Sequence, residues 1–275
     1  MKKQFLIIII SAMSFVASAQ LTIPAPSPGA SFTQKFGLTE VKVEYSRPGA
    51  KGRKIFGGVV PFSEIWRAGA NDPTKFTTSD SITVGGIGLP KGSYVILVRP
   101  TLYEWEVIFN KNPDVSYTNY KLADDVARVK VPTQKTAMVE SFTIAANNIS
   151  TNKCDLEFSW ENTLVRIPMV NETDKKIMAQ IQQKLDGPTA GEYQTIARYY
   201  YDMNKDQNKA LEIIDLAIKK SGEGIGNLQL KSMIQAKLGD KKGAIVTATN
   251  SLERARKANN QDYIRMNEKN ISEWR

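Results

Sequence analysis

Hydrophobic residues recur at two different spacings along this chain. From about Phe32 to Val170, short runs of alternating or β-branched residues are separated by glycines and prolines. In residues 41–45, for example, valine and tyrosine alternate with lysine and glutamate. About nine strands at this spacing, with no helical segment between them, predict an antiparallel β-sandwich or jelly roll.

The strands that this pattern predicts are short. They occupy residues 41–45, 74–78, 82–84, 93–99, 105–109, 126–131, 138–145, 154–160 and 163–169. Residues 85–92 contain four glycines and a proline and are predicted to form a long turn. Residues 20–30 carry prolines at every second position from Pro24 to Pro28, which indicates an extended leader.

The spacing becomes helical near Asp174. Residues 175–185 place apolar side chains at intervals of four, and Asp186-Gly187-Pro188 ends this segment. Further on, Ala210, Ile214 and Ala217 lie on one face of a predicted helix. We therefore expect five segments: a signal peptide at 1–19, the leader at 20–30, a β-sandwich domain at 31–170, a linker helix at 171–187 and a helical domain at 188–275.

The helical domain contains an internal repeat. Residues 209–218 align with residues 243–252, and Ala210 lies 34 positions before Ala244. This spacing resembles the tetratricopeptide repeat, which implies contact with a protein partner. Gln235 and Ser251 depart from that repeat, which usually has an aromatic residue and an alanine there. A helical bundle with coincidental spacing is the alternative.

The N-terminus has the pattern of an export signal. Lys2 and Lys3 precede the apolar run 5–16, and Ala17-Ser18-Ala19 has the small residues of a cleavage site. The mature chain is expected to begin at Gln20 and to be periplasmic or secreted. An uncleaved membrane anchor is the alternative, although the run is shorter than the ~20 residues that span a bilayer. No membrane span is expected in the mature chain.

Composition excludes several classes of chemistry. The formal net charge of +9 is spread along the chain without a long basic tract, so nucleic acid is not an expected partner. Histidine is absent and Cys154 is the only cysteine. Catalytic systems built on histidine and zinc sites with histidine ligands are therefore excluded. Cys154 lies in an alternating run and is predicted to be a small buried hydrophobe. No cofactor is expected.

Residues 45–71, the basic block, are the main candidate site. The block combines cations and aromatic residues with turn-forming glycines and prolines. The residues that could bind an anionic or carbohydrate group are Arg47, Lys51, Arg53, Trp66, Arg67 and Asn71. The alternative is that these arginines hold long loops in place by bonding to buried carbonyl and carboxylate groups.

Carboxylates give a second candidate chemistry. Glu64 or Asp72 could serve as the acid of a hydrolase or lyase that acts on envelope polysaccharide. Glu104 and Glu106 share one face of a predicted strand and are expected to point to solvent, opposite Trp105. The acids near residues 112–114 and 124–125 lack the spacing of a calcium loop and are read as turns.

Several motifs resemble one family. Tyr45-Ser-Arg-Pro48, Lys51-Gly-Arg-Lys-Ile-Phe-Gly57, Val60-Pro61 and Trp66-Arg-Ala-Gly-Ala-Asn71 are similar to those of the family known as domain of unknown function 2911, and Leu89–Tyr94 and Trp105–Asn110 resemble its later motifs. The resemblance covers about residues 27–160. It implies an exported bacterial β-domain and brings no activity, cofactor or catalytic residue.

Three functions fit the sequence. The first, and the favoured one, is a non-enzymatic binding protein whose basic block holds an anionic or carbohydrate group while the helical domain binds a protein. The second is the hydrolase or lyase. The third is a scaffold in an envelope assembly, in which the helical domain is the working surface.

Overall fold

The computed structural model describes residues 23–116, 118–184 and 187–275. The chain divides into two compact units, Met1–Thr173 and Asp174–Arg275, which we call the β unit and the helical unit. The predicted export signal lies outside the described residues. The boundary between the units lies near the end of the predicted sandwich domain at residue 170.

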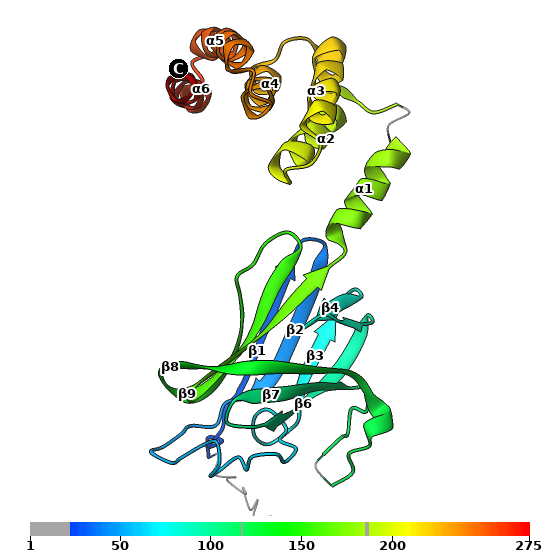
Figure 1. The fold of residues 1–275 in the computed structure, drawn as a ribbon, viewed down its shortest axis with the longest axis vertical. Helices are drawn as coiled ribbons and strands as arrows, with labels where there is room; N and C mark the ends of the chain where they lie inside the picture. Colours follow the sequence, from blue (N-terminus) through cyan, green and yellow to red (C-terminus); the bar gives the residue numbers. More distant parts are fainter. Residues whose placement is uncertain (1–22, 117, 185–186) are drawn as a thin grey trace, which may run out of the picture. The chain divides into compact units, whose positions relative to one another are not determined.

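The described part of the β unit forms a nine-stranded antiparallel sheet, with one short 3-10 helix at Leu122–Asp124 (Figure 1). The strands are β1 (Gly29–Phe36), β2 (Thr39–Ser46), β3 (Thr74–Thr78), β4 (Ile82–Val84), β5 (Ile87–Leu89), β6 (Gly92–Pro100), β7 (Glu104–Asn110), β8 (Asp125–Asn147) and β9 (Lys153–Asn171). Their order is β1-β2-β3-β6-β7-β8-β9-β4-β5.

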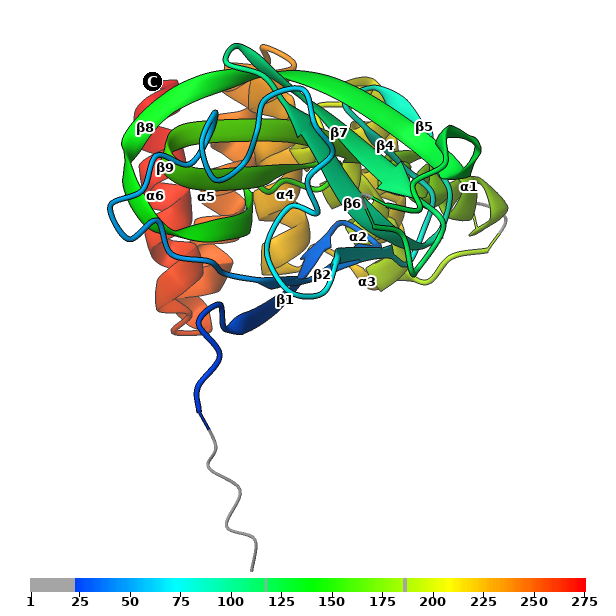
Figure 2. The ribbon, with the colours of Figure 1, turned by 90° about the horizontal axis from the view of Figure 1, so that it is seen from below.

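Two long strands fold this sheet into two facing layers. The first part of β8 pairs with β7, up to Pro132, and its second part pairs with β9 from Thr133 onward. The end of β9 pairs in turn with β4. Figure 2 shows β8 curving around the unit, so that one strand belongs to both layers. The predicted antiparallel β-rich domain followed by helices is confirmed, with the layers joined through a shared strand.

The strand boundaries differ from the prediction in four places. The segments 126–131 and 138–145 belong to β8, and the segments 154–160 and 163–169 belong to β9. The pairing of β8 with β9 shifts register between Lys135 and Val139 and again before Thr143. These irregularities let a strand bend while it stays paired, which is why the polar interruptions are not turns. The predicted turn 85–92 contains β5, and β1 begins within the predicted leader.

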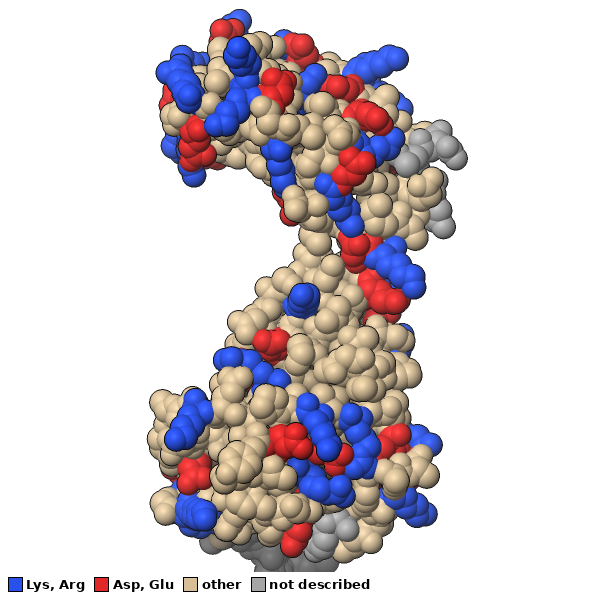
Figure 3. Space-filling model, in the orientation of Figure 1, with Lys and Arg blue, Asp and Glu red and all other residues tan. Residues whose placement is uncertain are grey.

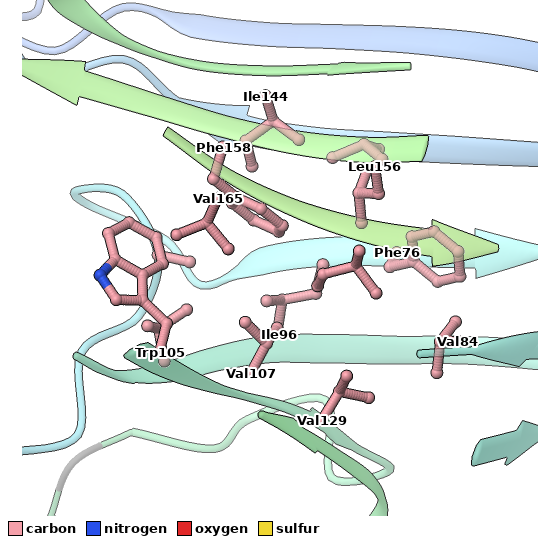
Figure 4. Packing of buried hydrophobic residues seen from close by; sticks show 14 of the residues in the cluster. Phe76, Val84, Ile96, Trp105, Val107, Val129, Ile144, Leu156, Phe158 and Val165 are labelled. Atoms are coloured by element: carbon pink, nitrogen blue, oxygen red, sulfur yellow. The ribbon is translucent and has the colours of Figure 1, made fainter. Parts of the chain in front are cut away.

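The core of the β unit lies between the two layers. Phe76, Ile96 and Val107 come from one layer and meet Ile144 and Phe158 from the other (Figure 4). All five are nearly or fully buried. The alternation that predicts each strand therefore also places its apolar side chains on the inner face.

Cys154 should resist alkylation in the folded protein. Its side chain is fully buried in this core, and burial together with the charge of Asp155 raises the pKa of the thiol to about 11. The reactive thiolate is then scarce at pH 8 and shielded from the reagent. We expect iodoacetamide to modify native protein at least a hundredfold more slowly than protein in 6 M guanidinium, as measured by intact mass. Equal rates would contradict the buried placement.

The helical unit contains six helices in its described part, counting α1, which starts at the boundary residue. They are α1 (Thr173–Lys184), α2 (Ala190–Asp202), α3 (Gln207–Ser221), α4 (Ile225–Lys237), α5 (Lys241–Lys257) and α6 (Gln261–Trp274). The predicted linker helix corresponds to α1. Ile196, Ile214 and Ile234 are buried in one apolar cluster of this unit.

Successive helix pairs repeat their local chemistry. Asp206 caps the N-terminus of α3 by accepting hydrogen bonds from the backbone, and Asp240 caps α5 in the same way, 34 residues later. Ala210 and Ala244 are both fully buried one turn beyond their caps. Both pairs, α2 with α3 and α4 with α5, are thus joined by short turns with the same cap.

Charged side chains of both signs are mixed on the face of each unit that Figure 3 shows, with Lys and Arg interspersed with Asp and Glu. Within the described residues, no helix is long and apolar enough to cross a bilayer.

Candidate functional site

The basic block forms the long connection between β2 and β3. Two isolated β-bridges join it to strands of the sheet. Gly49 pairs with Ser141 of β8, and Trp66 pairs with Val98 of β6 through two backbone hydrogen bonds of 2.8 Å. The connection is therefore a fixed part of the β unit, lying against strands of the sheet.

Each of the three predicted arginines donates to backbone carbonyl groups. Arg47 Nε donates to Phe142 O at 3.1 Å, and Arg53 Nη2 donates to Gly49 O at 2.7 Å. Arg67 Nη1 donates to Asn71 O at 2.6 Å. A guanidinium group that bonds carbonyl oxygens satisfies the turn acceptors of a long loop. These contacts match the alternative in which the arginines hold the loop in place.

The other predicted residues of the block are distributed around it. Lys51 and Arg53 line a cavity of about 290 Å³ together with Pro26, Ser27, Pro48 and Gly49. Asn71 donates from its side chain to Ser27 O at 3.0 Å. Trp66 packs against the core and stacks on Trp160, with ring centroids 5.9 Å apart. Neither Arg47 nor Arg67 lines the cavity that Lys51 and Arg53 share.

The two predicted acids, Glu64 and Asp72, have different surroundings. Glu64 is exposed, and Asp72 lines an open cavity of about 410 Å³ at the β1–β2 side of the sheet. The expectation that Glu104 and Glu106 both point to solvent holds for Glu104, whose side chain is exposed, and is wrong for Glu106, whose side chain is only 16% exposed. Its carboxylate accepts from Arg99 at 3.0 Å and from Arg128 at 2.7 Å, because these strands place the two arginines beside it.

Asp125 completes this charged cluster on the outer face of the sheet. It accepts from Asn110 and Arg128, at 2.8 and 3.0 Å, and from the hydroxyl of Tyr120. Burial and the hydrogen bond to Asp125 raise the pKa of Tyr120. Because the members satisfy one another, the cluster holds Tyr120 against the sheet. No group of acidic or cysteine side chains among the described residues could hold a metal ion.

A large cavity opens at one end of the two layers. Its volume is about 790 Å³, within the range of small-molecule sites. It is lined by Phe56, Phe62, Thr101, Leu102, Tyr103, Trp105, Thr133, Gln134, Lys135, Thr136, Glu161, Asn162 and Thr163. Aromatic rings, hydroxyl groups and amides dominate, with one lysine and one glutamate.

Local structure explains how these side chains gather. Tyr103 lies in the β6–β7 turn, which Thr101 closes by donating to Glu104 O at 2.8 Å. Thr133 of β8 donates to Leu102 O at 2.9 Å and so joins this turn to the bend of β8. The polar segments 133–136 and 161–163 line the cavity where β8 and β9 are irregular. The bends thus bring two polar segments to one opening.

The basic block supplies the aromatic side of this opening. Phe56 is buried and packs on Trp105, with ring centroids 5.0 Å apart. Phe62 covers Gly57, where an added Cβ would lie 2.6 Å from the Phe62 ring. Glu161 accepts a hydrogen bond from the backbone of Ile55 at 3.3 Å, which fixes the loop to β9.

Sequence reasoning missed most residues of this cavity. Leu102 and Tyr103 are 62% and 78% exposed although both are large and apolar or aromatic. The usable signal was the polar interruption of two β-type runs, at residues 132–137 and 161–162. In the sequence, such interruptions resemble turns between separate strands, and nothing in the pattern places their side chains at one opening.

Comparison with known proteins identifies one family model over residues 27–169, described as a protein of unknown function (DUF2911). No curated protein and no solved structure matches the chain. The matched range contains both the basic block and every residue that lines the large cavity.

Proposed function

The chain belongs to the DUF2911 family of proteins of unknown function, and we propose that it is an exported, non-enzymatic binding protein whose large cavity takes a carbohydrate. The observation that carries this proposal is the lining of the cavity. Exposed Tyr103 and half-buried Phe62 lie on the same opening as a set of threonine hydroxyls and side-chain amides.

This combination suits a sugar. A pyranose ring presents an apolar C–H face, which packs on an aromatic ring, and hydroxyl groups around its rim, which pair with hydroxyls and amides. Lys135 and Glu161 contribute opposite charges to the lining, so the site has no net charge that would select an anion. The arginines considered for an anionic ligand bond to carbonyl oxygens instead. A neutral carbohydrate is therefore favoured over an anionic group.

Binding is favoured over hydrolysis because of the acids present. Enzymatic cleavage of a glycosidic bond usually needs two carboxylates that flank it. Glu161 is the only acid among the described residues that line the large cavity. Glu64 and Asp72, the acids considered for a hydrolase or lyase, do not line it.

Tyr103→Ala should weaken carbohydrate binding about tenfold, a loss of about 1.4 kcal/mol. The reason is that the ring is exposed at the rim and free to pack on a sugar face. The probes are maltotriose, cellotriose and chitotriose, each titrated into ¹⁵N-labelled residues 20–275 and followed by NMR.

Two control variants localise the effect. Leu122→Ala removes a side chain that is 64% exposed and does not line the cavity, so affinity should not change. Arg53→Ala tests the basic block in the same assay. Loss of binding in Arg53→Ala with full binding in Tyr103→Ala would show that the ligand binds at the basic block. No binding of any trisaccharide at 10 mM would overturn the proposal.

We propose further that the helical unit binds a protein partner. The support is the repeated helix pair, whose caps at Asp206 and Asp240 follow the tetratricopeptide spacing. Deletion of residues 188–275 should then remove chemical cross-links to a reproducible partner in an envelope extract while the β unit stays folded. Unchanged cross-links would contradict this role.

A further inference from the structure

The sheet of the β unit has one long edge strand. Strand β1 stands first in the strand order and, among the described strands, pairs only with β2. It has eight residues, whereas β5 at the other end of the order has three. Figure 2 shows β1, in dark blue, at the margin of the sheet. A long edge strand presents backbone donors and acceptors with which another strand can pair.

The register with β2 determines which backbone groups of β1 point outward. Arg47 N donates to Pro28 O at 2.9 Å, and these two residues continue the register in which Gly29 lies opposite Ser46. They are therefore a hydrogen-bonded pair, and such pairs alternate with non-hydrogen-bonded pairs along antiparallel strands. Every second residue from Pro28 faces β2. The residues between them direct their N–H and C=O groups outward, namely Gly29, Ser31, Thr33 and Lys35.

Neither the backbone edge nor the inner face of β1 is fully covered. Of the outward backbone groups, Lys35 O accepts from the side chain of its neighbour Gln34 at 2.7 Å. Phe32 packs against the core of the β unit, yet it is only half-buried. Val43, which lies opposite it in β2, is fully buried. A strand beside β1 would therefore find backbone groups to pair with and an apolar ring to cover.

We propose that β1 pairs antiparallel with β1 of a second copy of this chain, about a two-fold axis at Phe32. In this register Gly29 lies opposite the partner's Lys35, and Ser31 lies opposite the partner's Thr33. All four outward residues of each strand then belong to hydrogen-bonded pairs. Phe32 lies opposite its own copy in a non-hydrogen-bonded pair, where side chains approach most closely. The register that joins the most backbone groups is thus also the one that covers the half-buried ring.

The charges on β1 fit the same register. Lys35 is the only charged residue of the strand, and it faces a glycine of the second copy. A register with Lys35 opposite its own copy would set two like charges against each other, which is destabilising. Ser31 faces a threonine, and hydroxyl side chains can form hydrogen bonds across strands. The edge is therefore complementary to itself, as a two-fold interface requires.

The pairing does not depend on the proposed carbohydrate function and is compatible with it. No residue of β1 lines the large cavity. The dimer therefore carries two copies of that cavity, and a polymer that reached both would bind with a gain in avidity.

Sedimentation velocity of residues 20–275 tests the pairing. A single strand pair is a small interface, so we expect a monomer at about 5 µM and mostly a dimer at about 500 µM. Thr33→Pro should be monomeric at both concentrations. Proline removes an outward N–H in the middle of the edge, and an edge strand tolerates proline where that N–H is not paired within the sheet. Protection of Cys154 from alkylation shows whether the variant is folded.

Gly29 offers a matched pair of variants that tests the register itself. A Cβ at this position would meet nothing within 4 Å, so the monomer has room for a side chain there. Gly29→Glu places a carboxylate opposite the partner's Lys35, and Gly29→Lys places a second ammonium group there. The two-fold axis repeats each contact, so the association constant should be about tenfold higher for Gly29→Glu at low salt. The difference should shrink in about 1 M salt.

Gly88, in β5 at the other edge, provides the control. A Cβ there would also meet nothing within 4 Å. Gly88→Glu and Gly88→Lys should associate equally, because β5 takes no part in the proposed interface. A charge effect at Gly88 with none at Gly29 would place the contact at the other edge and overturn the proposal.

The remaining outcomes also decide the matter. A wild-type monomer at about 500 µM overturns the proposal, and so does equal association of Gly29→Glu and Gly29→Lys. A dimer that persists in folded Thr33→Pro overturns it as well. A dimer that is lost in folded Thr33→Pro and is stronger in Gly29→Glu than in Gly29→Lys supports it. If Thr33→Pro does not fold, the two Gly29 variants decide alone.

Discussion

Gly85→Ala should destabilise the β unit by about 3–4 kcal/mol, whereas Gly86→Ala should cost about 1–2 kcal/mol. Both glycines lie in the turn between β4 and β5, and both have positive φ, 54° and 85°. The two positions differ in the space available for an added Cβ. A Cβ at Gly85 would lie 2.1 Å from Val129 Cγ1, while a Cβ at Gly86 would meet nothing within 4 Å.

The larger cost follows from two effects at Gly85. An L-residue with positive φ costs roughly 1–2 kcal/mol, and this applies to both positions. Only at Gly85 does the new methyl group also push against Val129, a core residue of β8, and overpacking of a core typically costs about 1–3 kcal/mol.

Alkylation of Cys154 provides the measurement. The thiol is the only one in the chain and lies in the core of the β unit. Its protection from alkylation at increasing urea concentration therefore reports the unfolding of this unit alone. The urea concentration at the unfolding midpoint should be far lower for Gly85→Ala than for Gly86→Ala, while the slope of unfolding free energy against urea should be similar. Equal midpoints would show that the β4–β5 turn does not pack on β8 as described.

The division into a β-rich half and a helical half could be predicted because burial imposes a period on the sequence. In β2, Val41, Val43 and Tyr45 are all buried, as the alternation requires. In α3, Ala210, Ile214 and Ala217 are buried, as the helical spacing requires. Such a pattern identifies a single strand or helix and contains no information about which other element it pairs with.

The continuity of β8 could not be predicted in the same way. A bend requires local irregularity, and residues 133–136 replace alternation with polar side chains that line a cavity. In sequence, such a stretch resembles a turn. Whether the chain reverses or only bends there depends on the partner strand, and pairing is a property of residues far apart in the chain.

The role of the basic block was open for a related reason. Arginine is suited both to anions and to backbone carbonyls, and only the acceptors nearby distinguish the two. For Arg47 the acceptors are Phe142 O and Thr143 Oγ1, about 95 residues away. Tyr103 could not be predicted as a cavity residue, because a single exposed tyrosine beside a turn belongs to no recognisable sequence pattern.

Phe158→Ala should destabilise the β unit by about 3–5 kcal/mol, the range for removal of a buried aromatic side chain. Phe158 of β9 is fully buried between the layers. Its ring lies near Phe142 and Trp105, with centroids 6.5 and 6.3 Å away. The truncation leaves a void that neighbours held on two paired layers cannot fill.

Phe158→Leu is the matched control, because it keeps most of the volume and should cost about 1.5 kcal/mol or less. Protection of Cys154 in urea measures both variants, and it excludes effects on the helical unit. The large gap between the two variants is expected because the cost comes from lost packing and cavity formation, with no polar group to compensate. Equal stability of Phe158→Ala and Phe158→Leu would mean that the layers close without this ring. The two layers would then be held together mainly by the strands that they share.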